Sequence, residues 1–454
     1  MKRVEYSGRK VLVMGLGLHG GGAGVARFLV SRGASVTVTD LRSEHDLIPS
    51  VEELRGLPVR LVLGGHRERD FLEADLVIRN PGVPADSPYL RVAERAGIPV
   101  EMEMGLFLAE WPAERTIGVT GTRGKSTTAS FIQHLLRTLG VRSVLAGNLR
   151  VSAVALLDGL RPDDTVVLEL SSFQLEGLEA RRLSPGVAVV TNLMPDHLNR
   201  YRDVAQYAEA KKTILKFQRD GDLAVLNRDD PYAESFATCA KGEVKWFSAR
   251  DRLPGWTEAR VSGAHNRANL SAGALAVSRF NPDEDTLAQA VRSFPGVPRR
   301  QELVDTVDGV RYVNDTTATT PEATLAALEA IPGPHALILG GSDKGLSFQA
   351  LADRLAELGE DISSVVLLPG EGTDRLRAAL KLRRVYEARD MDAAVEIARA
   401  SARPGGAVVL SPACASFGAF LNEFDRGDRF NHAVAALRER RPAERRQTAG
   451  RRAD

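Results

Sequence analysis

The chain has 454 residues, more than one hydrophobic core usually organises, so we expect two to four domains. Hydrophobic residues make up 43% of the chain and charged residues 26%, which is typical of a soluble globular protein. Because 60 Lys and Arg residues are balanced by 59 Asp and Glu residues, the charge argues against bulk binding to nucleic acid or to an anionic membrane.

The cysteines and the apolar runs narrow the setting further. Cys239 and Cys414 are too few for a disulfide framework and too far apart for a metal-binding motif. No apolar run approaches the roughly 18 residues needed to span a bilayer, and the N-terminus lacks the apolar core of a signal peptide. We therefore expect a cytoplasmic protein with no stable membrane insertion and no nucleic-acid partner.

The N-terminal part, predicted to form a first domain over residues 1–112, begins with a nucleotide-binding pattern. An apolar strand at 11–14 runs into the glycine-rich turn 15–20, a helix, and a second strand that ends at Asp40. A G-x-G-x-x-G turn with an acidic residue about 20 positions on is typical of dinucleotide sites. Taken alone it predicts NAD binding, but the rest of the chain offers no hydride-transfer site. A uridine diphosphate would use the same physics, with its diphosphate at the helix N-terminus and its uracil or ribose at Asp40 and Arg42.

The second domain, predicted over residues 113–296, is organised around the sequence Thr-Gly-Thr-Arg-Gly-Lys-Ser-Thr at 120–127. An apolar strand precedes this segment and an amphipathic helix follows it. Its glycines let backbone N–H groups curl around phosphate oxygens, Lys125 can reach the terminal phosphates, and Ser126 can ligate Mg²⁺. The strict P-loop pattern has a glycine where this chain has Val119, so we predict a variant phosphate loop.

Polar side chains follow the next two predicted strands of this domain. Glu169 ends a buried strand and is placed to hold Mg²⁺ beside the phosphate loop, the alternative being a solvated loop glutamate. His197 ends another strand, and its position in this group makes it a candidate second metal ligand, although a lone histidine is more often structural. Lys211 and Lys212 lie on an amphipathic helix, where lysines are ordinarily solvated.

The third domain, predicted over residues 297–440, alternates strands and helices again. Polar clusters follow its strands at 314–320, 340–345 and 411–416, and we expect them to meet along one edge of a sheet. The segment 441–454 is rich in arginine without apolar periodicity, which predicts a disordered basic tail.

Several of these segments occur in the order and spacing of one family. The phosphate loop is followed by Leu-Glu-Leu-Ser-Ser-Phe-Gln at 168–174, Asn-Leu-Met-Pro-Asp-His at 192–197 and Leu-Ser-Pro-Ala-Cys-Ala-Ser at 410–416. With these strings the chain resembles the Mur ligases over almost its whole length, and most of all the members that add glutamate to UDP-N-acetylmuramoyl-L-alanine for peptidoglycan. The resemblance implies an α/β fold of three domains: a Rossmann-like N-terminal domain, a central P-loop ATP-binding domain and a Rossmann-like C-terminal domain.

The resemblance also implies a mechanism. ATP phosphorylates the carboxylate of UDP-N-acetylmuramoyl-L-alanine, and the amino group of glutamate then displaces phosphate from the acyl phosphate. The catalytic residues implied are Lys125, Glu169, His197 and Lys211, the last as a carbamate. Mg²⁺ would be held by Ser126, Glu169, His197 and the Lys211 carbamate, in a protein expected to be a monomer.

The remaining implied contacts concern ATP and the two other substrates. ATP would be bound by Gly121, Thr122, Gly124, Lys125, Ser126, Thr127, Asn266, Asn269, Arg300 and Asp315. The UDP contacts would be Leu18, His19, Asp40, Arg42, Asn80 and Gly82, and the muramoyl-alanine contacts would be Asn148, Gln174 and His197. Glutamate would be bound by Thr319, Lys344, Ser416 and Phe417.

Some positions depart from the family pattern. Arg123 replaces an asparagine in the loop, and Arg299 replaces a histidine before Arg300. Near the incoming amino acid, Thr317 replaces a lysine, and Glu423 stands at a usually aromatic position. These two changes keep L-glutamate open as an alternative to the favoured D-glutamate. A folylpolyglutamate synthase-like ligase and a non-catalytic nucleotide-binding protein are more distant alternatives.

Overall fold

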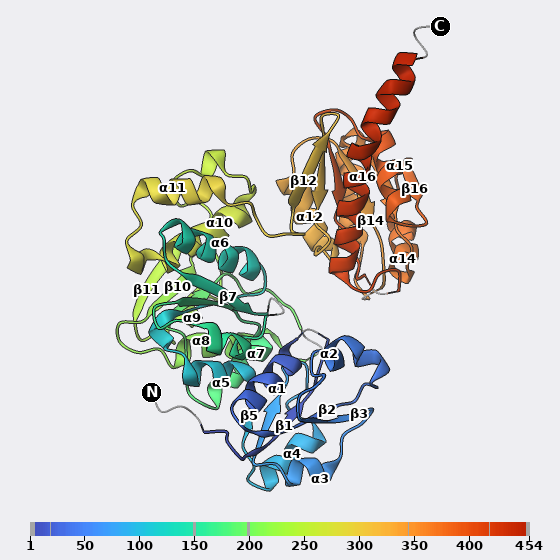
Figure 1. The fold of residues 1–454 in the computed structure, drawn as a ribbon. Coiled ribbons are helices and arrows are strands. Elements are labelled where there is room, and N and C mark those ends of the chain that lie inside the picture. Colours follow the sequence, from blue (N-terminus) through green and yellow to red (C-terminus); the bar gives the residue numbers. More distant parts are fainter. Residues whose placement is uncertain are drawn as a thin grey trace. The chain divides into compact units, whose positions relative to one another are not determined.

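The computed structural model describes residues 5–18, 20–148, 151–197, 200–343, 345–416 and 418–450, with the backbone alone for 439–450 (Figure 1). The chain forms two compact units. The first comprises Met1–Ala259 and Ala264–Phe294, and the second comprises Arg260–Gly263 and Pro295–Asp454. None of the described helices is both long enough and apolar enough to cross a membrane.

The N-terminal domain is a parallel five-stranded sheet of order β3-β2-β1-β4-β5. The strand order reverses between β1 and β4, and ligands bind at such switch points because the loops after the two strands diverge. The strands are β1 (Lys10–Met14), β2 (Ser35–Asp40), β3 (Val59–Leu63), β4 (Leu76–Arg79) and β5 (Val100–Glu101). The helices are α1 (Gly21–Ser31), α2 (Ile48–Glu52), α3 (Glu68–Leu72), α4 (Pro88–Arg95) and α5 (Glu103–Glu110).

The central domain has a parallel six-stranded sheet of order β11-β10-β9-β6-β8-β7. Every residue of β6, β8 and β9 is buried, as expected of parallel strands covered on both faces. The strands are β6 (Thr116–Thr120), β7 (Ser143–Gly147), β8 (Thr165–Glu169), β9 (Val187–Val190), β10 (Leu223–Asn227) and β11 (Glu243–Phe247). The helices are α6 (Lys125–Thr138), α7 (Ser172–Glu179), α8 (Val204–Lys216), α9 (Ala233–Ala237), α10 (Ala264–Ala276) and α11 (Glu284–Ser293).

These two domains share one hydrophobic core, which is why they form a single compact unit. Buried side chains of α5, including Leu106 and Phe107, belong to the same cluster as Leu175 and Leu178 of α7. The two helices approach closely at glycine, because a Cβ on Gly177 would lie 2.6 Å from the Met102 Cβ. The predicted domains 1–112 and 113–296 thus each contain one sheet and belong to the first unit, except residues 260–263 and 295–296, which belong to the second.

The C-terminal domain holds a six-stranded sheet of order β12-β13-β17-β14-β15-β16, parallel except for the β12–β13 hairpin. The strands are β12 (Glu302–Val307), β13 (Val310–Asn314), β14 (His335–Leu339), β15 (Ile362–Leu367), β16 (Val385–Glu387) and β17 (Ala407–Leu410). The helices are α12 (Pro321–Ala330), α13 (Gln349–Leu358), α14 (Glu371–Ala379), α15 (Met391–Ser401) and α16 (Glu423–Gly450).

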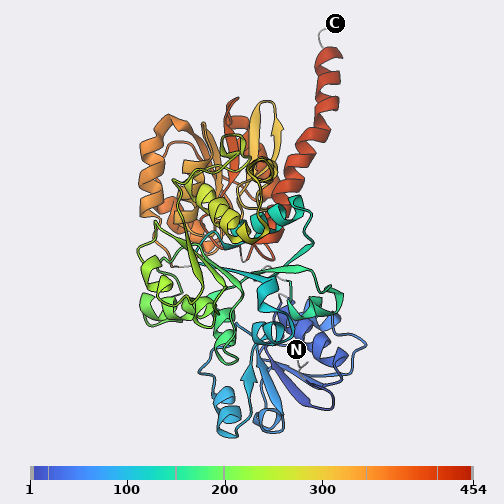
Figure 2. The ribbon, with the colours of Figure 1, turned by 90° about the vertical axis from the view of Figure 1, so that its left-hand side faces the viewer.

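Helix α16 extends beyond the rest of its own domain in both ribbon views (Figures 1 and 2). The predicted disordered tail at 441–454 therefore begins inside a helix, which continues to Gly450. The difference has a physical reason, since Ala, Glu, Arg and Gln are all good helix formers and fill most of this stretch.

Candidate active site

The phosphate loop lies between β6 and α6, and two of its glycines are dictated by close neighbours. Gly121 has φ +148°, and a Cβ there would lie 1.9 Å from the Thr191 Oγ1. Gly124 is the left-handed N-cap of α6 with φ +80°, and a Cβ there would lie 2.2 Å from the Asn269 Oδ1. No larger side chain fits at either position without moving these groups.

A second loop, 191–194, braces the phosphate loop. Thr191 Oγ1 donates to the carbonyl oxygens of Arg123 at 2.6 Å and Thr120 at 3.2 Å. Asn192 accepts from the Arg123 N–H through its side chain at 2.9 Å. Asn192 opens the family string at 192–197, but no local pattern marks either residue as a brace of the phosphate loop, because polar side chains follow strands in many ordinary loops.

Two lysines converge on one oxygen of the loop. Lys125 Nζ donates to the carbonyl oxygens of Gly121 and Thr122, both at 3.0 Å, and Lys211 Nζ donates to the same Gly121 oxygen at 2.9 Å. Lys211 is 1% exposed and its Nζ lies 4.6 Å from the centre of the Tyr207 ring. Lys212 instead pairs with Glu209 at 2.7 Å, so the two neighbouring lysines differ completely in surroundings.

Burial is the main cause that lowers the pKa of Lys211 well below its ordinary value, and the positive charge of Lys125 lowers it further. Asp196 opposes this shift. The environment therefore favours the neutral amine of Lys211, which is the nucleophilic form of a lysine.

Glu169, the last residue of β8, stands beside the start of the phosphate loop because it is in register with Val119 of β6. Its Oε1 accepts from Asn148 Nδ2 at 3.0 Å, but its Oε2 is buried without a hydrogen-bond partner in the described structure. Leaving a buried carboxylate oxygen without a partner costs about 1–3 kcal/mol or more. A cation at this position would remove that cost, so the residue fits a Mg²⁺ ligand.

Ser126 is buried and is the second residue of α6, the helix that begins directly after the phosphate loop. Among the described residues, no three His, Cys, Asp or Glu side chains gather as a metal-binding group. The predicted ligand set is of another kind, because it combines a hydroxyl, one carboxylate, an imidazole and a modified lysine.

His197 has φ +56° and lies against aromatic rings, with centroid separations of 4.9 Å to Phe173 and 6.0 Å to Tyr207. Burial lowers the pKa of His197 most, and the charges of Lys211 and Lys125 lower it further, against Asp196. These surroundings favour the neutral imidazole, the form that can ligate a metal ion.

A cavity of about 690 Å³ lies at the switch point of the N-terminal sheet. Asp40 on its wall accepts from the N–H groups of Leu16 at 2.9 Å, Gly17 at 3.2 Å and Arg42 at 3.0 Å. In this way the carboxylate holds the glycine turn in place. The predicted residues on this wall are Asp40, Arg42, Asn80 and Gly82.

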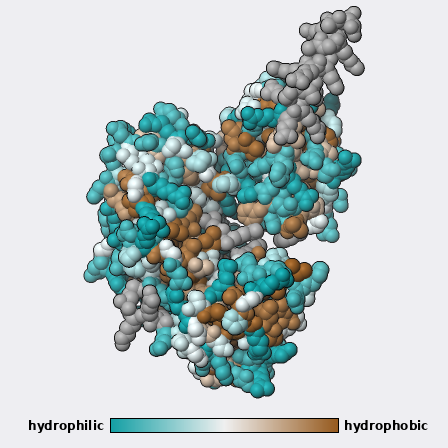
Figure 3. Space-filling model, in the orientation of Figure 1, coloured by the Kyte–Doolittle hydropathy of each residue, from teal (hydrophilic) through white to brown (hydrophobic). Residues whose placement is uncertain are grey.

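The other predicted UDP contacts are Leu18, which is 43% exposed, and His19, which lies outside the described residues. His66 also lines the cavity, although no pattern in the sequence marks it. Its Nδ1 lies 2.8 Å from the Thr39 Oγ1, and its ring meets the edge of Tyr89. Figure 3 shows an apolar patch on the N-terminal domain amid a largely hydrophilic surface.

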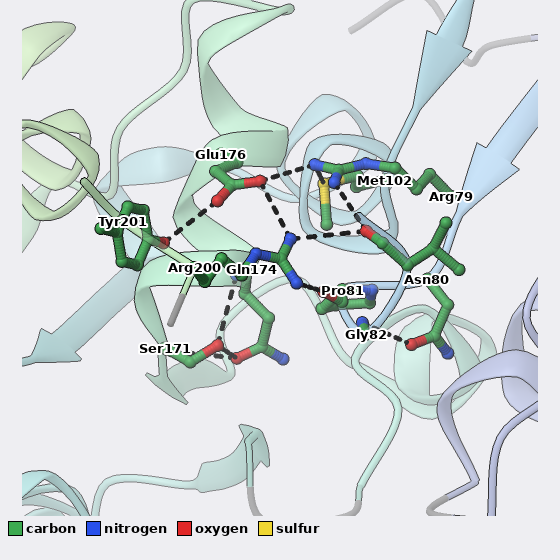
Figure 4. A network of polar contacts seen from close by, with 11 residues as sticks. Arg79, Asn80, Pro81, Gly82, Met102, Ser171, Gln174, Glu176, Arg200 and Tyr201 are labelled. Atoms are coloured by element: carbon green, nitrogen blue, oxygen red, sulfur yellow. Dashed lines mark hydrogen bonds and ion pairs between the residues drawn. The ribbon is translucent and has the colours of Figure 1, made fainter. Parts of the chain in front are cut away.

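The predicted muramoyl-alanine contacts follow β7, β8 and β9. Asn148 already donates to Glu169. Gln174 forms a capping box with Ser171 at the start of α7, in which each side chain accepts from the other residue's backbone N–H. Arg79, Glu176 and Arg200 form a polar network close by, which no local pattern in the sequence indicates (Figure 4).

The predicted ATP contacts of the first unit lie in the phosphate loop and on α6 and α10. Asn266 and Asn269 are buried on α10, and the Asn269 carbonyl oxygen accepts from the Thr128 hydroxyl at 3.3 Å. Asn269 therefore lies against Gly124 of the phosphate loop and Thr128 of α6. The hydroxyl of Thr122 accepts from the Met194 N–H at 2.9 Å. Thr127 is half-buried on α6.

In the second unit, Asp315 follows β13 and is buried. Ser411 Oγ donates to its Oδ2 at 2.9 Å, and the Gln301 N–H donates to its Oδ1 at 3.1 Å. Burial raises the pKa of Asp315 to about 7, against these hydrogen bonds and the charge of the exposed Arg300.

The predicted polar clusters of the second unit do converge. The Ala413 N–H donates to the Ala318 carbonyl, and the Ser342 N–H donates to the Ala415 carbonyl, both at 2.9 Å. Thr319 is half-buried and Ser416 is buried in these loops, whereas Lys344 and Phe417 lie outside the described residues.

No pattern in the sequence marks Arg426, yet its side chain connects the loops 314–320 and 411–416. It is fully buried and donates to Thr316 Oγ1 at 3.0 Å and to the carbonyls of Cys414 and Ala415 at 3.2 Å. Thr317, where the family pattern has lysine, donates from its hydroxyl to the Arg299 carbonyl at 3.1 Å. Arg299 itself pairs with Asp428 and lies over the Phe424 ring.

Comparison with known proteins gives three family matches in consecutive segments. The family models are "Mur ligase MurD-like, N-terminal domain" over residues 9–101, "Mur ligase middle domain" over 119–272, and "Mur ligase, glutamate ligase domain" over 299–414. Two curated relatives carry the name UDP-N-acetylmuramoylalanine--D-glutamate ligase. The protein from Roseiflexus sp. (strain RS-1) is 43% identical, covering 96% of this chain and 100% of that protein. The protein from Geobacter sp. (strain M21) is 37% identical, covering 95% and 99%.

Solved structures agree on the fold. UDP-N-acetylmuramate-alanine ligase MurC from Thermotoga maritima matches with a TM-score of 0.58 at 20% identity, covering 94% of this chain and 100% of that one. MurF from Acinetobacter baumannii matches with a TM-score of 0.58 at 14% identity, covering 96% and 92%. The predicted three-domain α/β fold is thereby confirmed, and the chain belongs to the Mur ligase family.

Proposed function

We propose that this protein is an ATP-dependent amide ligase that joins D-glutamate to UDP-N-acetylmuramoyl-L-alanine during peptidoglycan precursor synthesis. Mur ligases depend on ATP and generally use Mg²⁺, and the relatives named above are D-glutamate ligases over nearly the whole chain. The observation that carries the proposal is the group around the Gly121 carbonyl, where Lys125 and the buried Lys211 meet beside Glu169.

The first chemical step brings two anions together, because the substrate carboxylate must attack the γ-phosphate of ATP. An O–P bond forms to the carboxylate as the bond to the leaving ADP breaks, and an acyl phosphate results. Lys125 and the N–H groups of the loop would offset the phosphate charge. Ser126 and Glu169 would hold one Mg²⁺ and His197 a second, and these ions would supply further charge stabilisation.

We propose that Lys211 carries a carbamate in the working enzyme. Its neutral amine would add to CO₂ and release a proton, which converts a cationic side chain into an anionic ligand. Two observations support the modification of Lys211 and not Lys212: Lys211 is buried with a lowered pKa and points at the phosphate loop, whereas Lys212 is paired with Glu209. A carbamate beside Lys125 would also place a negative charge next to the Lys125 cation.

The second step forms the amide. The glutamate nitrogen attacks the carbonyl carbon of the acyl phosphate, loses a proton, and displaces inorganic phosphate as the C–O bond breaks. Thr319, Ser416, Lys344 and Phe417 would hold the incoming amino acid. Asn266, Asn269, Arg300 and Asp315 would bind the base and ribose of ATP, and Asp40, Arg42, Asn80 and Gly82 would bind UDP.

A comparison of the two glutamate enantiomers tests this function. Purified protein with Mg²⁺, ATP and UDP-N-acetylmuramoyl-L-alanine should release phosphate and form the dipeptide product when D-glutamate is added. Phosphate release with L-glutamate but not with D-glutamate would instead establish L-glutamate as the substrate, the alternative that Thr317 and Glu423 keep open. No release with either enantiomer would contradict the proposal. Because ATP and UDP-linked precursors are cytoplasmic, we propose a cytoplasmic location. We also propose that the protein is a monomer, and light scattering would measure its mass in solution.

A further inference from the structure

Glu176, a residue of α7, joins three segments of the first unit (Figure 4). Its Oε2 accepts from Arg79 Nη2 at 2.7 Å and lies 3.5 Å from Arg200 Nη2. Its Oε1 accepts from the Tyr201 hydroxyl at 3.1 Å. One carboxylate thus receives one arginine from the N-terminal domain and one from the central domain.

The two arginines continue from Glu176 to the loop that follows β4. Arg200 Nη1 donates to the Pro81 carbonyl at 3.0 Å and Nη2 to the Val83 carbonyl at 3.4 Å. Arg79 Nη1 donates to the same Val83 carbonyl at 2.9 Å. Arg200 also stacks over the Phe173 ring at 4.1 Å, and that ring packs against His197. The network therefore connects the backbone of the loop 80–83 to the surroundings of His197.

Each segment of the network lies next to a residue assigned to the site. Arg79 directly precedes Asn80 on the wall of the nucleotide cavity, and Arg200 follows His197 by three positions. The side chains are largely withdrawn from water, with exposed fractions of 7% for Arg79, 20% for Arg200 and 23% for Glu176. Charge-assisted hydrogen bonds at such burial fix geometry more firmly than exposed ion pairs do.

We propose that Glu176 is a positioning residue. It fixes the cavity lined by Asp40 and Asn80, the nucleotide cavity, relative to His197 at the end of the site where the amide forms. The inference rests on the proposed function, because a UDP-sugar substrate must reach from the cavity to His197 and contact both ends at once. Without the carboxylate, two guanidinium groups would face each other unneutralised, and the loop 80–83 would lose its fixed distance from His197. A ligand that occupies the cavity alone would sense little of this change.

The test compares two ligands on two variants of the same helix. Glu176→Gln keeps the shape of the side chain and removes its charge. Glu179→Gln is the matched control, since Glu179 lies on α7 but contacts Thr213 and Lys216 within the central domain. Affinities for UDP and for UDP-N-acetylmuramoyl-L-alanine are measured by calorimetry without ATP, and KM and kcat by phosphate release.

We expect Glu176→Gln to weaken UDP-N-acetylmuramoyl-L-alanine about tenfold but UDP only about twofold, because only the longer ligand spans both segments. The KM for ATP should stay within about twofold of the wild-type value, and the Glu179→Gln protein should match wild type in all these measurements. The double variant Arg79→Gln with Glu176→Gln should lose less affinity than the sum of the losses of the two single variants, because Arg79 and Glu176 share one ion pair.

Equal weakening of both ligands, unchanged binding, or additive losses in the double variant would each overturn the inference. Should Glu176→Gln fail to fold, Arg200→Lys provides the same test, since lysine lacks the planar fork whose two nitrogens bond the Pro81 and Val83 carbonyls. A wild-type protein that binds neither ligand would contradict the proposed function itself. If the wild-type protein is active and the Glu176→Gln protein matches it in ligand binding and turnover, this inference fails while the proposed function stands.

Discussion

Lys125 and Lys211 donate hydrogen bonds to the same atom, the carbonyl oxygen of Gly121, at 3.0 and 2.9 Å. Two amines held this close repel one another when both are protonated, and a phosphate or a carbamate between them would turn that repulsion into attraction. The arrangement therefore separates the roles of the two lysines, one for the phosphates of ATP and the other for modification.

The phosphate role of Lys125 gives the first prediction. Lys125→Ala should lower phosphate release by at least about 100-fold, because the charge that offsets the γ-phosphate is lost. Binding of UDP should be unchanged, since the nucleotide cavity lies in another domain. Lys212→Ala is the matched control and should retain normal turnover. Substantial turnover by the Lys125→Ala protein would contradict the assignment of the loop.

The modification of Lys211 is tested with labelled carbonate. Wild-type protein in ¹³C-bicarbonate should show a carbamate carbon signal by NMR, which Lys211→Ala removes and Lys212→Ala keeps. Turnover by the Lys211→Ala protein should be nearly lost. Acetate or formate should raise this residual turnover at least about tenfold by supplying the missing carboxylate oxygens. A Lys211→Ala protein with normal activity, or a signal that persists in it, would show that the carbamate is not there.

The parts of the site that the sequence predicts are those encoded locally. The loop between β6 and α6 follows from glycine spacing and from the buried strand before it, and Glu169 follows from its place at a strand end. Local pattern did not separate Lys211 from Lys212, because an amphipathic helix with a broad apolar face leaves either lysine free to point inward. The resemblance to the Mur ligases favours Lys211, and the packing of α8 against the loop gives the physical difference between the two lysines.

Residues whose contacts span long sequence separations could not be predicted from the sequence. Arg426 bonds Thr316, 110 positions away, and Arg200 bonds Pro81, 119 positions away. An arginine that will be buried has the same local sequence as an arginine that will be solvated, so nothing marks it before the chain folds. The same reasoning applies to Thr191, whose hydroxyl braces the phosphate loop from the loop that follows β9.

Asp315 gives a prediction about pH. Burial raises its pKa from 3.8 to about 7, so the folded protein binds a proton that the unfolded chain has released between these two values. Stability must then fall as the pH rises from about 4 to about 7, and the loss is complete above that range. Asp315→Asn should remove this loss and gain roughly 1–3 kcal/mol relative to wild type at about pH 8 but little at about pH 4.

Urea unfolding of both proteins at the two pH values measures this difference. The same proton should affect ATP, because only the ionised carboxylate can accept two hydrogen bonds from ribose hydroxyls while Ser411 and Gln301 donate to it. The KM of the wild-type protein for ATP should therefore rise below about pH 7. A stability difference that does not change with pH would contradict the raised pKa.

The glycine at the start of α6 offers a test that separates backbone strain from contact with the site. Gly124 and Gly140 lie at the two ends of α6 with nearly the same φ, +80° and +74°. Alanine at either position incurs a strain of about 1 kcal/mol. At Gly140 nothing lies within 4 Å of the added Cβ, whereas at Gly124 the Asn269 Oδ1 would be 2.2 Å away.

Gly140→Ala should lower the unfolding midpoint slightly and leave the KM for ATP unchanged. Gly124→Ala should raise that KM at least about tenfold, because Asn269 must move out of the position from which it would bind the nucleotide. Equal kinetic effects from the two substitutions would mean that strain in the helix ends, and not the contact between Gly124 and Asn269, governs ATP binding.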